Sequence, residues 1–131
     1  MIQLGFDATQ VKRIERSLQN PRFVQRVFSQ QEWALISARP HPAQTAAAHF
    51  ASKEALSKAL GCGLFGFALA EAAVLRRAGG APYFELSGAL AKTLQTRGLA
   101  AEVSLSHEGG FAFACVLLQP AQNGAAAKTK V

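Results

Sequence analysis

The sequence is poor in acidic residues and in cysteine, and it has no long uninterrupted apolar run. Of its 131 residues, 14 are Lys or Arg and only 8 are Asp or Glu, so the formal net charge is +6. Hydrophobic residues make up 50% and charged residues 17%, which excludes a disordered chain and predicts one domain with a substantial core. The basic surplus predicts an acidic partner, and charge alone leaves nucleic acid, membrane, protein and phosphorylated small molecules open.

The scarcity of cysteine excludes the common zinc sites. Cys62 and Cys115 stand far apart in apolar surroundings, without the paired spacing that zinc ligands show. We expect two buried free thiols in a reduced, cytoplasmic protein. No basic-then-apolar leader and no apolar segment of membrane length is visible, so neither secretion nor a membrane partner is expected. The phosphate-binding patterns GxGxxG and GxxxxGK[ST] are also missing.

The local patterns predict helices mainly in the first half and paired strands mainly in the second. This distribution indicates an α+β fold, a single domain with a mainly antiparallel sheet packed on a long central helix. We expect the domain to cover residues 1–119 and a flexible, basic tail to cover 120–131. Helices are predicted at 9–17, 22–28, 29–38, 44–60 and 88–97, and strands at 2–6, 70–77, 82–86, 101–107 and 110–118. Ser29 and Glu32 match a capping box at the start of the third helix, and Ser87 can cap the last one.

One charged stripe lies on the long, otherwise largely apolar helix. Glu54 and Lys58 are four residues apart, which is the spacing of an ordinary surface ion pair. A carboxylate on a packed helix needs a partner, however, and Asp7 is the only aspartate in the chain. Asp7 either caps the helix that follows it or joins Glu54 in supplying oxygens to Mg²⁺, with Lys58 beside a substrate phosphate.

A histidine marks the end of a predicted strand. His107 stands beside Glu108 just before a glycine-rich turn, where it is either structural or placed to reach a ligand. No HExxH pattern is present, so the histidines do not indicate a zinc protease.

Together these segments resemble the acyl-carrier-protein synthase type of 4'-phosphopantetheinyl transferase. The most specific match is FASKEALSKALGCG at residues 50–63. Shorter pieces accompany it in the family's order. Before it stand Gly5-Phe6-Asp7 with Lys12-Arg13-Ile14, and then Arg22-Phe23 and Arg26-Val27-Phe28-Ser29 followed by Glu32. After it stand Gly80-Ala81-Pro82-Tyr83 and Ser104-Leu105-Ser106-His107-Glu108. The matching pieces extend over about residues 2–118, nearly the whole predicted domain.

The resemblance implies transfer of 4'-phosphopantetheine from coenzyme A to a serine of an apo acyl carrier protein, with Mg²⁺ and with release of adenosine 3',5'-bisphosphate. It also implies a homotrimer with active sites between subunits. Asp7 and Glu54 would hold the metal and Lys58 the transferred phosphate, and either Glu54 or a metal-bound water would deprotonate the serine. The coenzyme is expected beside Lys53, His49, Gly80, Pro82, Ser106 and His107, and the acidic carrier beside Arg13, Arg16, Arg22 and Arg26.

Two positions depart from the family's usual pattern. His49 stands where arginine is common, and Ala81 stands where lysine is common between Gly80 and Pro82. Both changes remove a permanent positive charge that could bind the coenzyme. They leave open an alternative, a module that binds the carrier or coenzyme A but transfers little. Binding to nucleic acid would depend on net charge alone and is not expected.

Overall fold

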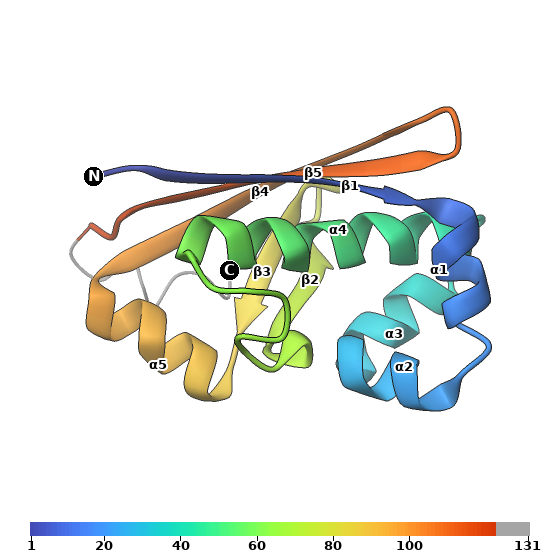
Figure 1. Cartoon of the computed structure of the whole chain (residues 1–131), viewed down its shortest axis with the longest axis horizontal. Coiled ribbons are helices and arrows are strands. Elements are labelled where there is room, and N and C mark those ends of the chain that lie inside the picture. The colour runs from blue at the N-terminus through green and yellow to red at the C-terminus, as the bar shows by residue number, and fades with distance from the viewer. Residues whose placement is uncertain (123–131) are drawn as a thin grey trace.

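A three-stranded antiparallel sheet lies along one long helix in the computed structural model, which describes residues 1–122 (Figure 1). The strand order is β1-β5-β4, with β1 at Gln3–Gln10, β5 at Phe111–Pro120 and β4 at Leu99–Glu108. The helix is α4, Pro42–Leu60, and it contacts β1 and β5 along their inner face. The predicted α+β class with an antiparallel sheet on a central helix is therefore confirmed.

The remaining elements gather at the two ends of α4 (Figure 1). Three short helices cover its first half, and a two-stranded antiparallel hairpin and a last helix lie toward its second half. The three helices are α1 (Val11–Ser17), α2 (Pro21–Val27) and α3 (Gln30–Ser37); the 3₁₀ turn η1 (Leu69–Glu71) leads into the hairpin strands β2 (Ala72–Arg76) and β3 (Pro82–Leu86), and α5 (Gly88–Arg97) follows.

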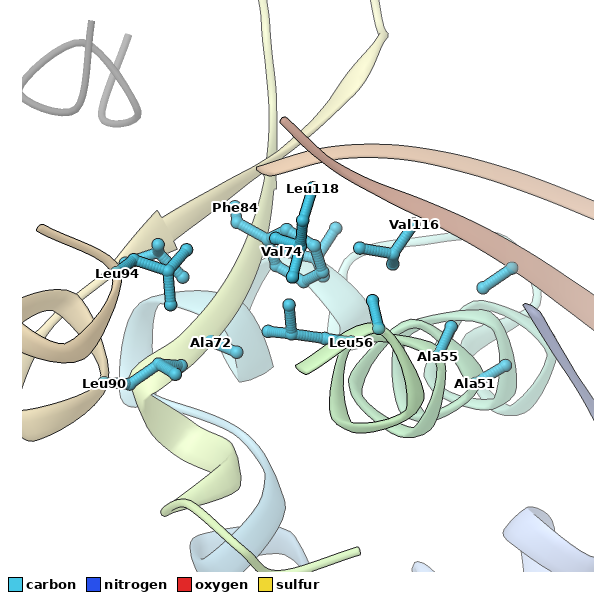
Figure 2. Packing of buried hydrophobic residues seen from close by; sticks show 13 residues of the cluster. Ala51, Ala55, Leu56, Ala72, Val74, Phe84, Leu90, Leu94, Val116 and Leu118 are labelled. Atoms are coloured by element: carbon cyan, nitrogen blue, oxygen red, sulfur yellow. The ribbon is translucent and has the colours of Figure 1, made fainter. Parts of the chain in front are cut away.

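The core lies between α4, the inner face of the sheet and the hairpin. Figure 2 shows Leu56 of α4 close to Val74 of β2 and Leu118 of β5, all fully buried. Small residues on α4 let the sheet approach closely. At Gly5 of β1 even a Cβ would overlap the carbonyl oxygen of Ala55, so only glycine permits this distance between strand and helix.

The outer face of the sheet is largely apolar over β1 and β5 and is uncovered within the described chain. Because successive side chains alternate between faces, the residues next to the inward-facing Gly5 and Thr9 on β1 point outward. We call the following residues the apolar outer face: Leu4, Phe6, Phe111, Phe113 and Leu117. Leu4 and Phe6 are 64% and 56% exposed, and the Phe6 and Phe113 rings stack with centroids 6.2 Å apart.

The structure corrects the predicted position of Asp7. We expected strand 2–6 to end just before it, but β1 continues to Gln10 and Asp7 lies inside the strand. Helix α1 begins at Val11, and Gln10 at its N-cap makes no side-chain capping bond. The interpretation of Asp7 as a helix cap is therefore wrong, and its carboxylate is available for other contacts.

Two of the predicted helix caps also differ. Ser29 accepts the backbone N–H of Glu32 at 3.1 Å as predicted, but the Glu32 carboxylate turns into the core instead of completing a capping box. At α5, Ser87 makes no capping bond, and the Glu71 carboxylate accepts the N–H of Leu90 at 3.2 Å. A carboxylate from another element thus accepts one of the free backbone N–H groups at the start of α5.

Other expectations are met in part. Cys62 and Cys115 are free as predicted, but both are half-buried rather than buried. Pro120 is the last residue of β5, and most of the expected tail, 123–131, lies outside the described residues. No helix within residues 1–122 is both long and apolar enough to cross a membrane.

Candidate active site

Two carboxylates from different elements meet where β1 crosses α4. Asp7 and Thr9 are two residues apart on β1, so both side chains point toward the helix. The Thr9 hydroxyl lies 3.2 Å from Oε1 of Glu54 and 3.5 Å from Oδ2 of Asp7. The structure therefore brings Asp7 and Glu54 together, although 47 positions separate them in the chain, and it adds Thr9 between them.

Two cations border these carboxylates. Lys58 Nζ donates to Oδ1 of Asp7 at 2.9 Å and to the carbonyl oxygen of Phe6 at 3.0 Å. Arg13 of α1 comes within 4.0 Å of Glu54. The partner of Lys58 is thus Asp7, and the ordinary Glu54–Lys58 surface pair is not among the contacts of the described chain. We call Asp7, Thr9, Glu54 and Lys58 the carboxylate site.

The surroundings of the carboxylate site oppose the ionisation of Glu54. Burial, followed by the neighbouring Asp7, raises the pKa of Glu54 from 4.5 to about 7. Hydrogen bonding to Asp7 raises the pKa of Lys58. When the ionisation of a carboxylate is opposed in this way, a further cation beside it stabilises the charged form. No group of three or more His, Cys, Asp or Glu that could hold a metal occurs in residues 1–122, so the donor set is two carboxylates.

The raised pKa of Glu54 predicts a specific dependence of stability on pH. With EDTA present, the folded protein holds the Glu54 proton up to about pH 7, whereas the unfolded chain releases it near 4.5. The wild type should therefore lose stability relative to Glu54→Gln as pH rises from about 5 to 7. Urea unfolding of both proteins across this range measures the difference. A difference that does not change with pH would contradict the raised pKa, and the comparison cancels the contributions of other titrating groups.

A second charged group is buried behind the carboxylate site. Glu32 of α3 accepts hydrogen bonds at 2.9 Å from both His49 Nδ1 and Lys53 Nζ, and all three side chains are fully buried. Lys53 also donates to the carbonyl oxygens of Leu69 and Ala72 at 3.0 and 2.7 Å. We call Glu32, His49 and Lys53 the buried triad.

The buried triad corrects two site assignments. We expected Lys53 and His49 to lie beside the coenzyme, but neither side chain reaches the surface. All three N–H donors of the Lys53 ammonium form hydrogen bonds to protein oxygens. Burial lowers the pKa of His49 and of Lys53, and the pairing with Lys53 and His49 outweighs burial in holding the pKa of Glu32 below its usual value. These groups connect α3, α4, η1 and β2, which is a structural role.

The other predicted coenzyme residues lie at exposed positions, except Pro82, which is half-buried. Gly80 is in the β2–β3 turn at φ +96°, a conformation that favours glycine, and Pro82 begins β3. Ser106 and His107 lie near the end of β4 and line a pocket of about 250 Å³ together with Arg39 and Arg76. Their contact with the coenzyme stays a prediction.

The four arginines assigned to the carrier are all exposed on the first two helices. Arg13 and Arg16 are three residues apart on α1, and Arg22 and Arg26 lie on α2. The Arg26 guanidinium lies 4.2 Å from the centre of the exposed Phe65 ring. Arg13 alone also borders the carboxylate site, so the basic surface and the site are contiguous. Carrier binding by this surface stays a prediction.

Sequence reasoning missed Thr9, Glu32, Arg39 and Arg76. Thr9 could have been found, since a strand extended by two residues places it on the same face as Asp7. Glu32 was interpreted as a capping residue and as part of a segment that matches the family, but no local pattern links it to His49 and Lys53, 17 and 21 residues later. Arg39 and Arg76 come from a loop and a strand that meet only in the folded chain.

Comparisons with known proteins agree with the geometry. The family model described as the 4'-phosphopantetheinyl transferase superfamily matches residues 3–116. A holo-[acyl-carrier-protein] synthase of Myxococcus xanthus is 44% identical over 119 residues, covering 88% of this chain and 93% of the relative. The crystal structure of that enzyme from Neisseria meningitidis superposes with a TM-score of 0.83 at 30% identity, covering 91% of this chain and 99% of the other.

A ligand-bound structure is also similar. The holo-[acyl-carrier-protein] synthase of Helicobacter pylori in complex with coenzyme A has a TM-score of 0.77 at 28% identity, covering 88% of this chain and 99% of the other. The family model, the relatives and the superposed structures therefore agree over nearly all of the described residues. The chain belongs to the 4'-phosphopantetheinyl transferase superfamily, within its holo-[acyl-carrier-protein] synthase family.

Proposed function

We propose that this protein transfers the 4'-phosphopantetheine group from coenzyme A to a serine hydroxyl of an apo acyl carrier protein, releasing adenosine 3',5'-bisphosphate. The observation that carries the proposal is the convergence of Asp7, Glu54 and Lys58 at one exposed edge of the sheet. Phosphoryl transfer asks a protein mainly to position the reactants and to neutralise charge, and this group is suited to both. The membership of the family supports the same reaction.

The carboxylate site fits Mg²⁺. Magnesium prefers oxygen ligands and commonly takes one or two carboxylates, the remaining positions going to water and substrate phosphate. Asp7 and Glu54 supply such a pair, and the raised pKa of Glu54 supports the binding of a cation beside it. We propose that these two residues hold the ion, which when bound supplies positive charge against the pyrophosphate of the coenzyme.

The chain's own groups account for the other requirements. Lys58 carries a charge, only partly neutralised by Asp7, that reaches a phosphate beside the carboxylate site. The Thr9 hydroxyl holds the Glu54 carboxylate in place through one oxygen. Glu54 is the group placed to accept the serine proton, directly or through an intervening water. No covalent intermediate on the protein is required.

We propose that the exposed arginines of α1 and α2 bind the acidic carrier. Charge reversal in Arg13→Glu/Arg16→Glu should raise KM for the carrier by about tenfold or more, since each rim charge acts mainly on the association rate. Initial rates at low and high salt measure this effect, which should shrink as salt rises. Arg97→Glu on α5 is the matched control. A carrier KM that is unchanged at low salt would exclude this surface as the docking site.

We propose that the apolar outer face is buried in a homotrimer whose active sites lie between subunits. Exposed aromatic and aliphatic side chains on one contiguous sheet face are typical of an interface. Phe6→Asp should therefore lower the molar mass measured by light scattering to that of one chain. Leu64→Asp, which places the same charge on an exposed loop outside the sheet, should leave the mass unchanged. A wild-type monomer would contradict the proposal.

The reaction itself is tested by incubation with coenzyme A, Mg²⁺ and apo acyl carrier proteins from the same genome. Mass spectrometry should show the phosphopantetheine group on one of them. Binding of carrier or coenzyme without any product would instead identify a module that transfers little. We place this reaction in the cytoplasm, in agreement with the two free cysteines.

A further inference from the structure

The segment between α4 and η1 carries two exposed apolar side chains that do not belong to the apolar outer face. Residues 61–68 turn back from the end of α4 toward α2, on the side of α4 away from the sheet (Figure 1). Leu64 and Phe65 lie in this segment and are 37% and 46% exposed. Because the apolar outer face lies on the far side of the sheet, a homotrimer formed through that face does not account for these two side chains.

Phe65 holds an unfavourable backbone conformation. Its φ is +67°, and no other non-glycine residue within 1–122 has a positive φ. This region is disfavoured for a residue with a bulky side chain, because the Cβ atom comes too close to the carbonyl oxygen that follows. Backbone strain of this kind persists only where the surrounding structure holds it, and it is found most often in segments that bind or catalyse.

The Phe65 ring packs against an arginine of α2. The guanidinium of Arg26 lies 4.2 Å from the centre of the ring. Arg26 is exposed, and no salt bridge in the described chain joins it or Arg22 to a carboxylate. A cation–π contact at an exposed site contributes little to folding, so it does not explain why a half-exposed ring is kept in a strained conformation. The pair instead presents an apolar ring and a positive charge side by side at the surface.

This combination of side chains is suited to a protein partner. Aromatic and arginine side chains are enriched where protein interfaces gain most of their binding energy. The basic surface of α1 and α2 favours an acidic partner by charge complementarity. Arg13 connects this surface to the carboxylate site, and Arg26 connects it to Phe65. The same partner can therefore contact the arginines and the ring.

We infer that Phe65 and Arg26 together bind the carrier, and that Phe65 selects carriers that present an apolar side chain beside an acidic one. The identity of the partner rests on the proposed function. The exposed arginines act over a distance and mainly on the rate of association. A ring contact acts only after the two proteins have met, so it lowers the rate of dissociation and distinguishes one acidic carrier from another.

Phe65→Gly tests the ring. Glycine relieves the positive φ but gives the unfolded chain more freedom, so the melting temperature should change little. KM for the carrier should rise about tenfold, with KM for coenzyme A unchanged. Unlike the effect of Arg13→Glu/Arg16→Glu, this increase should be the same at low and high salt, because the lost contact is apolar. Phe65→Tyr keeps the ring and should behave as the wild type does.

Arg26→Gln tests the pair. If the guanidinium and the ring act together, the losses of carrier affinity in Arg26→Gln and Phe65→Gly should not add in the double variant. Calorimetric titration with apo carrier, without coenzyme A, measures this binding apart from catalysis. Arg97→Gln removes an exposed guanidinium on α5 and should bind the carrier as the wild type does. Losses that add fully would show two separate contacts and would contradict the pair.

Three results for Phe65→Gly would overturn the inference. The first is an unchanged affinity and KM for the carrier. The second is weaker binding of coenzyme A, which would place the ring beside the coenzyme. The third is a lower molar mass by light scattering, which would place the ring between subunits. A wild type that binds apo carrier through Phe65 but forms no product supports the inference and contradicts the proposed transfer, whereas a wild type that does not bind apo carrier contradicts the inference.

Discussion

Replacing Glu54 by glutamine should lower kcat/KM for phosphopantetheine transfer by a factor of about 10²–10⁴, while the protein folds normally. The amide keeps the size of the side chain and one oxygen for Thr9, so the packing of α4 is retained. It removes the negative charge that, in the function we propose, acts with Asp7 to hold a cation. Because burial and Asp7 oppose the ionisation of Glu54, the neutral amide should leave the metal-free protein at least as stable as the wild type above pH 7.

The measurement combines initial rates with Mg²⁺ titration and thermal melting. Asp7→Asn should produce a loss of similar size, and it should also release Lys58 from its hydrogen bond at 2.9 Å. Glu85→Gln is a suitable control, because it makes the same change in the β2–β3 hairpin, away from the carboxylate site. Full activity in Glu54→Gln would remove this residue from the site. A loss of activity that accompanies unfolding would say nothing about metal binding, so the melting curves are essential.

Replacing Lys53 by methionine should reduce the free energy of unfolding by about 3–5 kcal/mol. The methionine fills a similar volume, but it leaves the Glu32 carboxylate in the core with His49 alone and leaves the carbonyl oxygens of Leu69 and Ala72 without their donor. A buried charge that loses its partner is among the most destabilising changes in a folded protein. The loss is a large part of the 5–15 kcal/mol that stabilises an ordinary domain.

Lys58→Met provides the matched control, five residues further along the same helix. Its side chain is 58% exposed, so the loss of its ion pair with Asp7 should cost less than about 1 kcal/mol. Urea unfolding of both variants separates the two lysines. Equal losses in the free energy of unfolding would show that burial of Lys53 does not determine how much it contributes to stability. In activity assays the order should be reversed. Lys58→Met should lose more activity than Lys53→Met, because Lys58 borders the carboxylate site and Lys53 does not.

The elements whose patterns are local were predictable. The alternation around Phe113, the stop at Gly61 and the length of the apolar helix each depend on neighbouring residues, and the structure has β5, α4 and its end close to the predicted places. Asp7 was misplaced at the end of a strand because Ala8, Thr9 and Gln10 carry no clear strand pattern. These three residues adopt the extended conformation of a strand because they pair with β5, whose residues lie more than 100 positions away in the sequence.

The site was predictable only where the family's motifs reach it. Asp7, Glu54 and Lys58 belong to matching segments and do meet in the structure. Lys53 belongs to the same segment, yet its side chain points to the opposite side of α4, where Glu32 of another helix receives it. Adjacent residues on a helix differ in direction by about 100°, so one of two neighbouring charged residues can face the surface while the other is buried.

The contact at Gly5 connects the fold to the chemistry. Strand β1 and α4 touch there through backbone atoms, because no side chain fits between Gly5 and Ala55. Asp7 follows two residues later on that strand, and Glu54 precedes Ala55 directly on that helix. The separation of the two backbone segments that carry these carboxylates is therefore set by main-chain contact, which has no rotamers and little freedom to relax. Substitutions elsewhere in the core can change side-chain volumes without altering this separation, whereas any substitution of Gly5 would widen it.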